Sequence, residues 1–264
     1  MENERDYKIN KRRKIIIIVV FFILLFISIY IGVKLVTSNN GYNEIKPPIV
    51  ETPDVVVPET SDEQVKVVTE RMKQVGELQK KNSDVVGYLE IPGTNVSYPV
   101  VQAKDNDYYM RRTYEKKSSK YGALFVDKDY SFTKPSSNMM IYGHNIGDKK
   151  NKMFEQLLEY QKESFYKAHP TITFTTAKEE STYEIIAAFR SRVYTNLDKN
   201  VFRYYFFIDA KNEQEFNDYV KNSIAACKYK TGKTAKYGDE LMTLSTCTYY
   251  EEDGRFAVVA RKVK

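Results

Sequence analysis

Residues 243–256 read TLSTCTYYEEDGRF and place a cysteine at the end of one strand-like run and an arginine at the start of the next. The flanking segments 241–248 and 255–263 are rich in β-branched and apolar residues, and an acidic, glycine-containing turn joins them. This pattern predicts a β-hairpin. Cys247 and Arg255 are then neighbours on adjacent strands.

Side chains alternate between the two faces of a strand, so direct pairing of Cys247 with Arg255 fixes which residues share a face. Thr243, Ser245 and Cys247 fall on one face, which is the more polar one. A guanidinium beside a thiol favours the thiolate, and it can also donate hydrogen bonds to an oxyanion that forms during acyl transfer. The hairpin therefore predicts an active site centred on Cys247.

The first quarter of the chain differs from the rest. Residues 15–33 form a run of 19 residues without charge, and roughly 20 apolar residues suffice to cross a membrane as a helix. Five basic residues at positions 8–14 precede the run and only Lys34 follows closely, which predicts a cytoplasmic N-terminus and an external C-terminal part. The alternative is a cleaved signal peptide, but the run exceeds a typical apolar core and no small-residue cleavage pattern follows it.

The formal net charge of +6 is shared between the residues before this segment and the rest of the chain. Residues 1–14 contain six basic and three acidic residues and contribute +3, so the remainder of the chain carries only +3. No dense basic patch interleaved with aromatic residues is present, and nucleic-acid binding is therefore not predicted.

We divide the chain into a basic cytoplasmic N-terminus (1–14), a transmembrane signal anchor (15–36), an extracellular linker (37–61) and one folded domain (62–264). The linker holds four of the eight prolines of the chain, which is typical of an extended spacer. Ser61 and Gln64 resemble a capping box, and apolar residues at helical spacing predict a helix that ends near Asn82. Those apolar residues are Val65, Val68, Met72, Val75 and Leu78.

Short β-rich segments separated by proline and glycine turns follow this helix. Together they predict a mainly β fold, an eight-stranded barrel with accessory helices. The predicted strands are 85–91, 96–102, 123–126, 138–142, 171–175, 182–192, 241–248 and 255–263, and the predicted helices are 105–114, 153–160 and 212–229.

Two cysteines in an exported domain can form a disulfide, so this alternative has to be weighed. Cys227, however, continues a helical series with Phe216, Tyr219, Val220 and Ile224, which predicts a small core residue rather than a reactive one.

A cysteine nucleophile needs a partner that exchanges protons near neutral pH, and histidine is the usual residue. The chain has two histidines. His144 lies where a predicted strand ends in a glycine-containing loop, a position where functional side chains concentrate. His169 precedes Pro170 at the start of another strand, and we interpret it as structural. His144 is the predicted partner of Cys247.

These residues together resemble the class B sortases. The resemblance rests on Thr-Leu-Ser-Thr-Cys at 243–247 with Arg255, on Tyr-Gly-His-Asn at 142–145, and on the segments 85–89, 98–102 and 105–109. It covers roughly residues 62–264, including the leading helix and the long helix before the cysteine strand.

The resemblance implies a membrane-anchored cysteine transpeptidase of a Gram-positive bacterium that needs no metal or organic cofactor. Its partners would be exported proteins bearing a C-terminal sorting motif and an amine on a peptidoglycan precursor. Cys247 would form a thioacyl intermediate at a Thr carbonyl, His144 would transfer protons, and Arg255 would hold the oxyanion. Asn106, Tyr142 and Ser245 match substrate-groove positions. Thr248 departs from class B members that carry an acidic residue there.

Two other functions stay open at this point. One is a cysteine protease or hydrolase, in which water rather than an amine resolves the thioacyl intermediate. The other is a non-catalytic anchored surface domain with a buried Cys247. The sequence does not identify the sorting motif, the cargo proteins, the acceptor amine, the oligomeric state or the balance of hydrolysis and transfer.

Overall fold

The computed structural model describes residues 68–264. The predicted cytoplasmic segment, membrane anchor and linker, together with the first residues of the predicted folded domain, lie outside this range. Among the helices of the described part, none is both long and apolar enough to span a bilayer.

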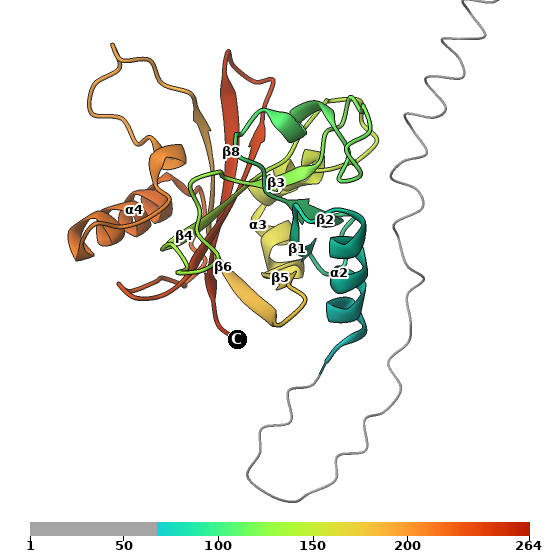
Figure 1. Ribbon diagram of the computed structural model, residues 1–264. Helices are drawn as coiled ribbons and strands as arrows, with labels where there is room; N and C mark the ends of the chain where they lie inside the picture. The colour runs from blue at the N-terminus through green and yellow to red at the C-terminus, as the bar shows by residue number, and fades with distance from the viewer. Residues whose placement is uncertain (1–67) are drawn as a thin grey trace, which may run out of the picture. The chain divides into compact units, whose positions relative to one another are not determined.

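Eight strands form a closed barrel in the order β1-β2-β3-β4-β7-β8-β6-β5, and β5 pairs back onto β1 (Figure 1). The predicted mainly β barrel is therefore confirmed, and each strand lies within about two residues of its predicted position. Their bounds are β1 Val85–Glu90, β2 Ser97–Val101, β3 Leu124–Val126, β4 Asn138–Tyr142, β5 Thr171–Thr175, β6 Glu180–Arg192, β7 Leu241–Cys247 and β8 Gly254–Lys262.

The helices agree less closely with the sequence. Helix α2 (Glu70–Lys81) begins later than predicted, because Thr69 caps it by accepting a hydrogen bond from the backbone NH of Met72 at 3.2 Å. Val68 precedes this cap and is exposed, so it is not part of the helical face. Helix α4 (Glu213–Ala226) begins after the cap Asn212, as predicted, but it ends at Ala226, three residues before the predicted end at Tyr229.

Two predicted helices are only short 3₁₀ segments. The segment 105–114 contains η1 (Tyr108–Arg111), and the segment 153–160 largely coincides with η2 (Glu155–Gln161). Helix α3 (Glu163–Ala168) and η3 (Tyr204–Phe206) were not predicted. Apolar spacing does not distinguish an α-helix from a 3₁₀ turn over so few residues.

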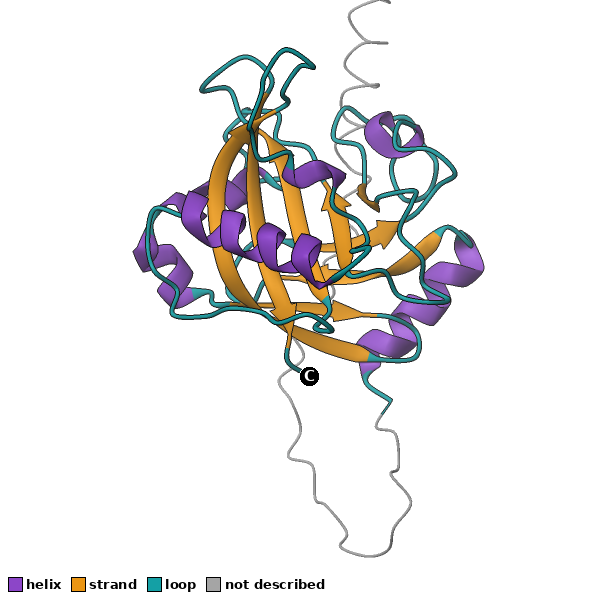
Figure 2. Ribbon diagram, turned by 90° about the vertical axis from the view of Figure 1, so that its left-hand side faces the viewer, coloured by secondary structure: helices purple, strands orange, loops and turns teal. Residues whose placement is uncertain are grey.

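The long connection between β6 and β7 packs against one face of the barrel and contains η3 and α4 (Figure 2). Tyr204, Phe216 and Tyr219 from this connection join Met140 of β4 and Val259 of β8 in one buried cluster. Phe207 stacks on Tyr219 with ring centroids 4.1 Å apart. This aromatic layer covers part of the barrel face, and the candidate site lies on the same face.

Candidate active site

A groove lies on the barrel face in two adjoining parts of about 380 Å³ and 290 Å³. The β6–β7 connection borders the larger part, and the segment 106–110 borders the smaller one. Both parts are lined by Asn106, Tyr142, Ser245 and Arg255. The larger part adds residues of η3 and the acidic pair Asp127 and Asp129, whereas the smaller part adds the predicted catalytic residues His144 and Cys247. All six predicted site residues therefore line the smaller part.

Strand register explains this convergence. In the antiparallel β7–β8 pair, Cys247 lies directly opposite Arg255, which confirms the predicted pairing. In the parallel β4–β7 pair, Tyr142 lies beside Ser245. Because side chains alternate along a strand, Ser245 and Cys247 share a face, and Tyr142 and Arg255 share it with them. Residues far apart in the sequence thus meet on one barrel face.

His144 follows the end of β4 and is partly buried. Its Nε2 lies 2.7 Å from the carbonyl oxygen of Met110 in η1. A carbonyl oxygen only accepts hydrogen bonds, so Nε2 carries the proton and Nδ1 is the nitrogen left to exchange one. Burial lowers the pKa of His144; the Met110 hydrogen bond opposes this shift, and the nearby Arg111 adds to it. The neutral imidazole is therefore favoured.

Cys247 and Arg255 are both partly buried at the ends of their strands. Nη1 of Arg255 donates hydrogen bonds to the carbonyl oxygens of Asp253 and Gly254, at 3.2 and 3.0 Å, which tie the guanidinium to its own turn. The Cys247 carbonyl accepts a hydrogen bond from Nδ2 of Asn145 at 3.0 Å. This bond joins the chain after His144 to the end of β7.

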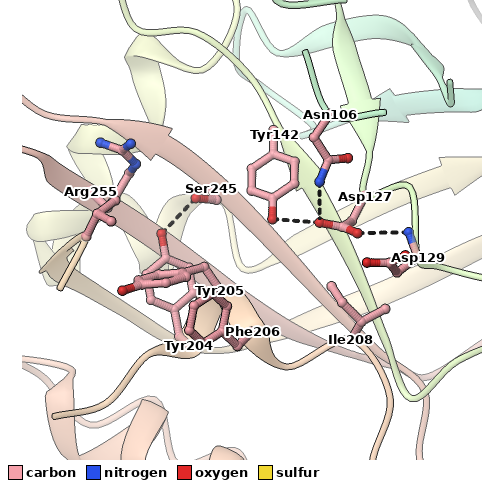
Figure 3. Close-up of a pocket in the computed structure, with 11 residues that line it drawn as sticks. Asn106, Asp127, Asp129, Tyr142, Tyr204, Tyr205, Phe206, Ile208, Ser245 and Arg255 are labelled. Carbon is pink, nitrogen blue, oxygen red and sulfur yellow. Dashed lines mark hydrogen bonds between the residues drawn. The ribbon is translucent and has the colours of Figure 1, made fainter. Parts of the chain in front are cut away.

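The three predicted substrate-binding residues have buried or partly buried hydrogen-bond partners (Figure 3). Asn106 and Tyr142 both donate to the carboxylate of Asp127, at 2.9 Å each. Burial, with the negative charge of Asp127 beside it, raises the pKa of Tyr142. Ser245 exchanges a 2.7 Å hydrogen bond with the hydroxyl of Tyr204.

Three groups at the site were missed by sequence reasoning: the Met110 carbonyl, Asp127 and Tyr204. Asp127 directly follows β3, and a polar residue at a strand end was the one signal that pointed to it. Tyr204 lies in a connection whose path across the barrel has no local sequence signature. The Met110 contact is made by a backbone atom, which residue type does not reveal.

The other cysteine and histidine lie outside the groove. Cys227 packs against the buried cluster, as predicted for a core residue, but it is only partly buried and caps α4 instead of lying within it. Ile224 of the same predicted apolar face is exposed. Both cysteines have free thiols. Nδ1 of His169 lies 2.8 Å from the Pro92 carbonyl oxygen, and its ring packs on Phe165. His169 is a structural residue here.

The smaller part of the groove thus combines a thiol, an imidazole with one free nitrogen and a guanidinium. These are the groups required for nucleophilic attack on a carbonyl, proton transfer to a leaving amine and stabilisation of an oxyanion. Within residues 68–264, no cluster of three His, Cys, Asp or Glu side chains is arranged to bind a metal ion.

Comparisons with known proteins agree with this geometry. Residues 89–263 match the sortase domain family. Sortase B of Staphylococcus aureus is 30% identical over 72% of this chain and 75% of its own length, and sortase B of Listeria monocytogenes is 32% identical over 72% and 74%. The solved Staphylococcus aureus sortase B–substrate complex superposes with a TM-score of 0.65 at 30% identity, covering 73% of this chain and 86% of that one. The chain therefore belongs to the sortase family, as a class B sortase-type cysteine transpeptidase.

Proposed function

We propose that this sortase is a membrane-anchored enzyme that cleaves a C-terminal sorting motif after Thr and transfers the protein to a peptidoglycan amine. The observation that carries the proposal is the placement of Cys247 opposite Arg255, with His144 lining the same part of the groove. Each of these three side chains takes one role in a reaction of two steps.

In the first step, His144 accepts the thiol proton of Cys247, and the sulfur attacks the Thr carbonyl to form a tetrahedral oxyanion. Arg255 pairs with Cys247 in the β7–β8 ladder, and this pairing supports a role for its guanidinium as hydrogen-bond donor to the oxyanion. The peptide C–N bond then breaks, His144 protonates the leaving amine, and a thioester to Cys247 remains.

In the second step, an incoming amine gives up a proton to His144 and attacks the thioester. A new peptide bond forms, and the Cys247 sulfur leaves and takes the proton back from His144, which restores the thiol and the neutral imidazole. A solved sortase B structure in complex with triglycine is 29% identical to this chain, with a TM-score of 0.64. That complex supports a glycine-type amine as the acceptor class for this enzyme.

Asn106, Tyr142 and Ser245 are proposed to bind the sorting peptide. All three line both parts of the groove, whose larger part also presents Tyr205 and Phe206 of η3. The groove therefore combines apolar rings with hydrogen-bonding groups, which suits an extended peptide. The Staphylococcus aureus sortase B–substrate complex supports a binding groove of this kind.

We also propose a single-pass location in the cell membrane, with the catalytic domain outside. The support is in the sequence alone: the uncharged run 15–33, the basic cluster before it and the proline-containing linker after it. The linker would hold the domain away from the bilayer.

The first test is intact-mass spectrometry of the 62–264 domain with a small library of sorting-signal peptides and triglycine. We expect a Cys247-linked acyl adduct, cleavage after Thr and a product extended by triglycine. Cys247→Ala should abolish all three, while Cys227→Ala, the matched control outside the groove, should keep them. Circular dichroism would check that both variants are folded.

Two results would count against this function. A product distribution that stays hydrolytic as triglycine increases would contradict transfer. Cleavage by Cys247→Ala would contradict the thioacyl mechanism.

A further inference from the structure

Asp127 contributes a buried carboxylate to the groove. It directly follows β3, is 5% exposed and lines the larger part of the groove. Its Oδ2 accepts hydrogen bonds from Nδ2 of Asn106 and the hydroxyl of Tyr142, at 2.9 Å each, and its Oδ1 accepts one from the backbone NH of Asp129, also at 2.9 Å (Figure 3).

All of these partners are neutral donors, and Asp127 takes part in none of the ion pairs found within residues 68–264. A buried carboxylate without an ion pair depends on its hydrogen bonds to replace lost hydration. Hydrogen bonds to a charged acceptor are also stronger than neutral ones. The carboxylate therefore favours the side-chain orientations in which Asn106 and Tyr142 both donate to it.

These bonds decide which atoms the groove offers to a substrate. The Oδ1 of Asn106 accepts the backbone NH of Lys128 at 2.8 Å, so both ends of its amide are occupied and its orientation is set. One N–H of Asn106 remains available as a donor. Because Tyr142 gives its proton to Asp127, the phenolic oxygen remains available as an acceptor. A donor and an acceptor side by side complement a peptide amide.

We propose that Asp127 is a positioning residue for substrate recognition: it holds Asn106 and Tyr142 so that they present one donor and one acceptor to the sorting peptide. This inference rests on the proposed function, because it concerns the peptide that Cys247 cleaves. Asp127 itself acts through its two partners and takes no part in the chemical steps.

The test is Asp127→Asn, which keeps the shape but leaves one acceptor oxygen for three donors. We expect KM for the sorting peptide to rise about tenfold and kcat to change less than about threefold, as the loss of oriented binding groups requires. The alkylation rate of Cys247 by iodoacetamide should stay at the wild-type value. Asp84→Asn is the matched control, because Asp84 also accepts a tyrosine hydroxyl, from Tyr109 at 2.7 Å, and lines neither part of the groove.

A double-mutant comparison tests whether the effect passes through the two partners. In an Asn106→Ala, Tyr142→Phe background, Asp127→Asn should raise KM by no more than about twofold. A full tenfold rise in that background would overturn the positioning role. So would an unchanged KM in the single variant, or a fall in kcat together with slower alkylation of Cys247.

An NMR measurement that does not depend on catalytic activity tests this inference separately from the proposed function. In the wild type, the side-chain NH₂ signals of Asn106 should show one proton protected from solvent exchange, and Asp127→Asn should remove that protection. If the wild type cleaves no peptide, the proposed function fails and this NMR signal alone decides the positioning. Unchanged exchange in Asp127→Asn would refute the inference in either case.

Discussion

The two histidines of the chain differ in what surrounds them, and this difference distinguishes the predicted catalytic residue from the structural one. His144 has one ring nitrogen bonded to a backbone carbonyl and the other left free in the groove wall. His169 is bonded to Pro92 and packed on an aromatic ring away from the groove. Residue type is the same in both cases, so the environment decides the function.

We predict that His144 titrates below its ordinary pKa of 6.5, because burial disfavours the imidazolium. The folded state then binds this proton less tightly than the unfolded state, so His144 makes the free energy of unfolding decrease as the pH falls from 6.5 through the lowered pKa. Two imidazole signals are expected in ¹³C-histidine NMR, and His169→Gln assigns them. A pKa of His144 above 6.5 would contradict the burial argument.

Removing either partner of Cys247 should slow the reaction without unfolding the domain. His144→Ala and Arg255→Ala are each expected to lower kcat/KM by about 10²–10³, the usual loss when a proton-transfer or oxyanion group is deleted. His169→Ala and Arg71→Ala are the controls, since Arg71 is paired with Glu90 near α2. Near-normal turnover in a groove variant would remove that residue from the mechanism.

At the scale of elements, close packing at the end of β4 affects the position of the predicted catalytic residue His144. Gly143 separates Tyr142 from His144, and a β-carbon built there would clash with Leu124 and would lie 2.6 Å from Phe154. Both of those side chains are fully buried, so neither has space to move away. The position of His144 therefore depends on the absence of a side chain at Gly143.

Two glycine substitutions should change the free energy of unfolding in opposite directions. We expect Gly143→Ala to lower the free energy of unfolding by about 1–3 kcal/mol through overpacking and to reduce activity by displacing His144. Gly76→Ala, inside α2 with nothing within 4 Å of the added carbon, should raise it by about 0.5–1 kcal/mol. Urea unfolding measures both changes. A Gly143→Ala variant with wild-type stability and activity would refute the close approach.

For the whole molecule, an ion cluster links strands β6 and β8 to the β6–β7 connection. Glu184 of β6 pairs with Arg261 of β8 and, at 2.8 Å, with Lys233 of the β6–β7 connection. Burial opposes ionisation of Glu184, but hydrogen bonds from Lys233 and Arg261 outweigh it and lower the pKa below 4.5. The cluster stabilises the attachment of the connection that forms one wall of the groove.

We predict that Glu184→Gln lowers the free energy of unfolding by about 1–3 kcal/mol at pH 7, since Lys233 loses its carboxylate partner and Arg261 keeps only the longer pair with Asp239, at 3.7 Å. Because the folded pKa is lowered, the contribution is complete above pH 4.5 and is lost as the pH falls through the folded pKa. Urea unfolding at several pH values should therefore show the two proteins converging in acid. Glu70→Gln, at an exposed pair, should change stability by less than about 0.5 kcal/mol. A constant difference down to about pH 3 would contradict this assignment.

The sequence by itself determined the barrel class, the strand positions and the pairing of Cys247 with Arg255, because strand period and turn composition are local properties. It also pointed to His144 through its place at a strand end. The 3₁₀ nature of η1 and η2 and the late start of α2 were not predicted, because short helical segments depend on packing and on capping contacts.

Only the tertiary structure decided how the groove is completed. The carboxylate of Asp127, the hydroxyl of Tyr204 and the carbonyl of Met110 come from separate segments and reach the site through barrel closure and the path of the β6–β7 connection. Such contacts arise between elements distant along the chain, where periodicity carries no information. The sequence therefore pointed to the predicted site residues, and the fold specified the groups that hydrogen-bond to them.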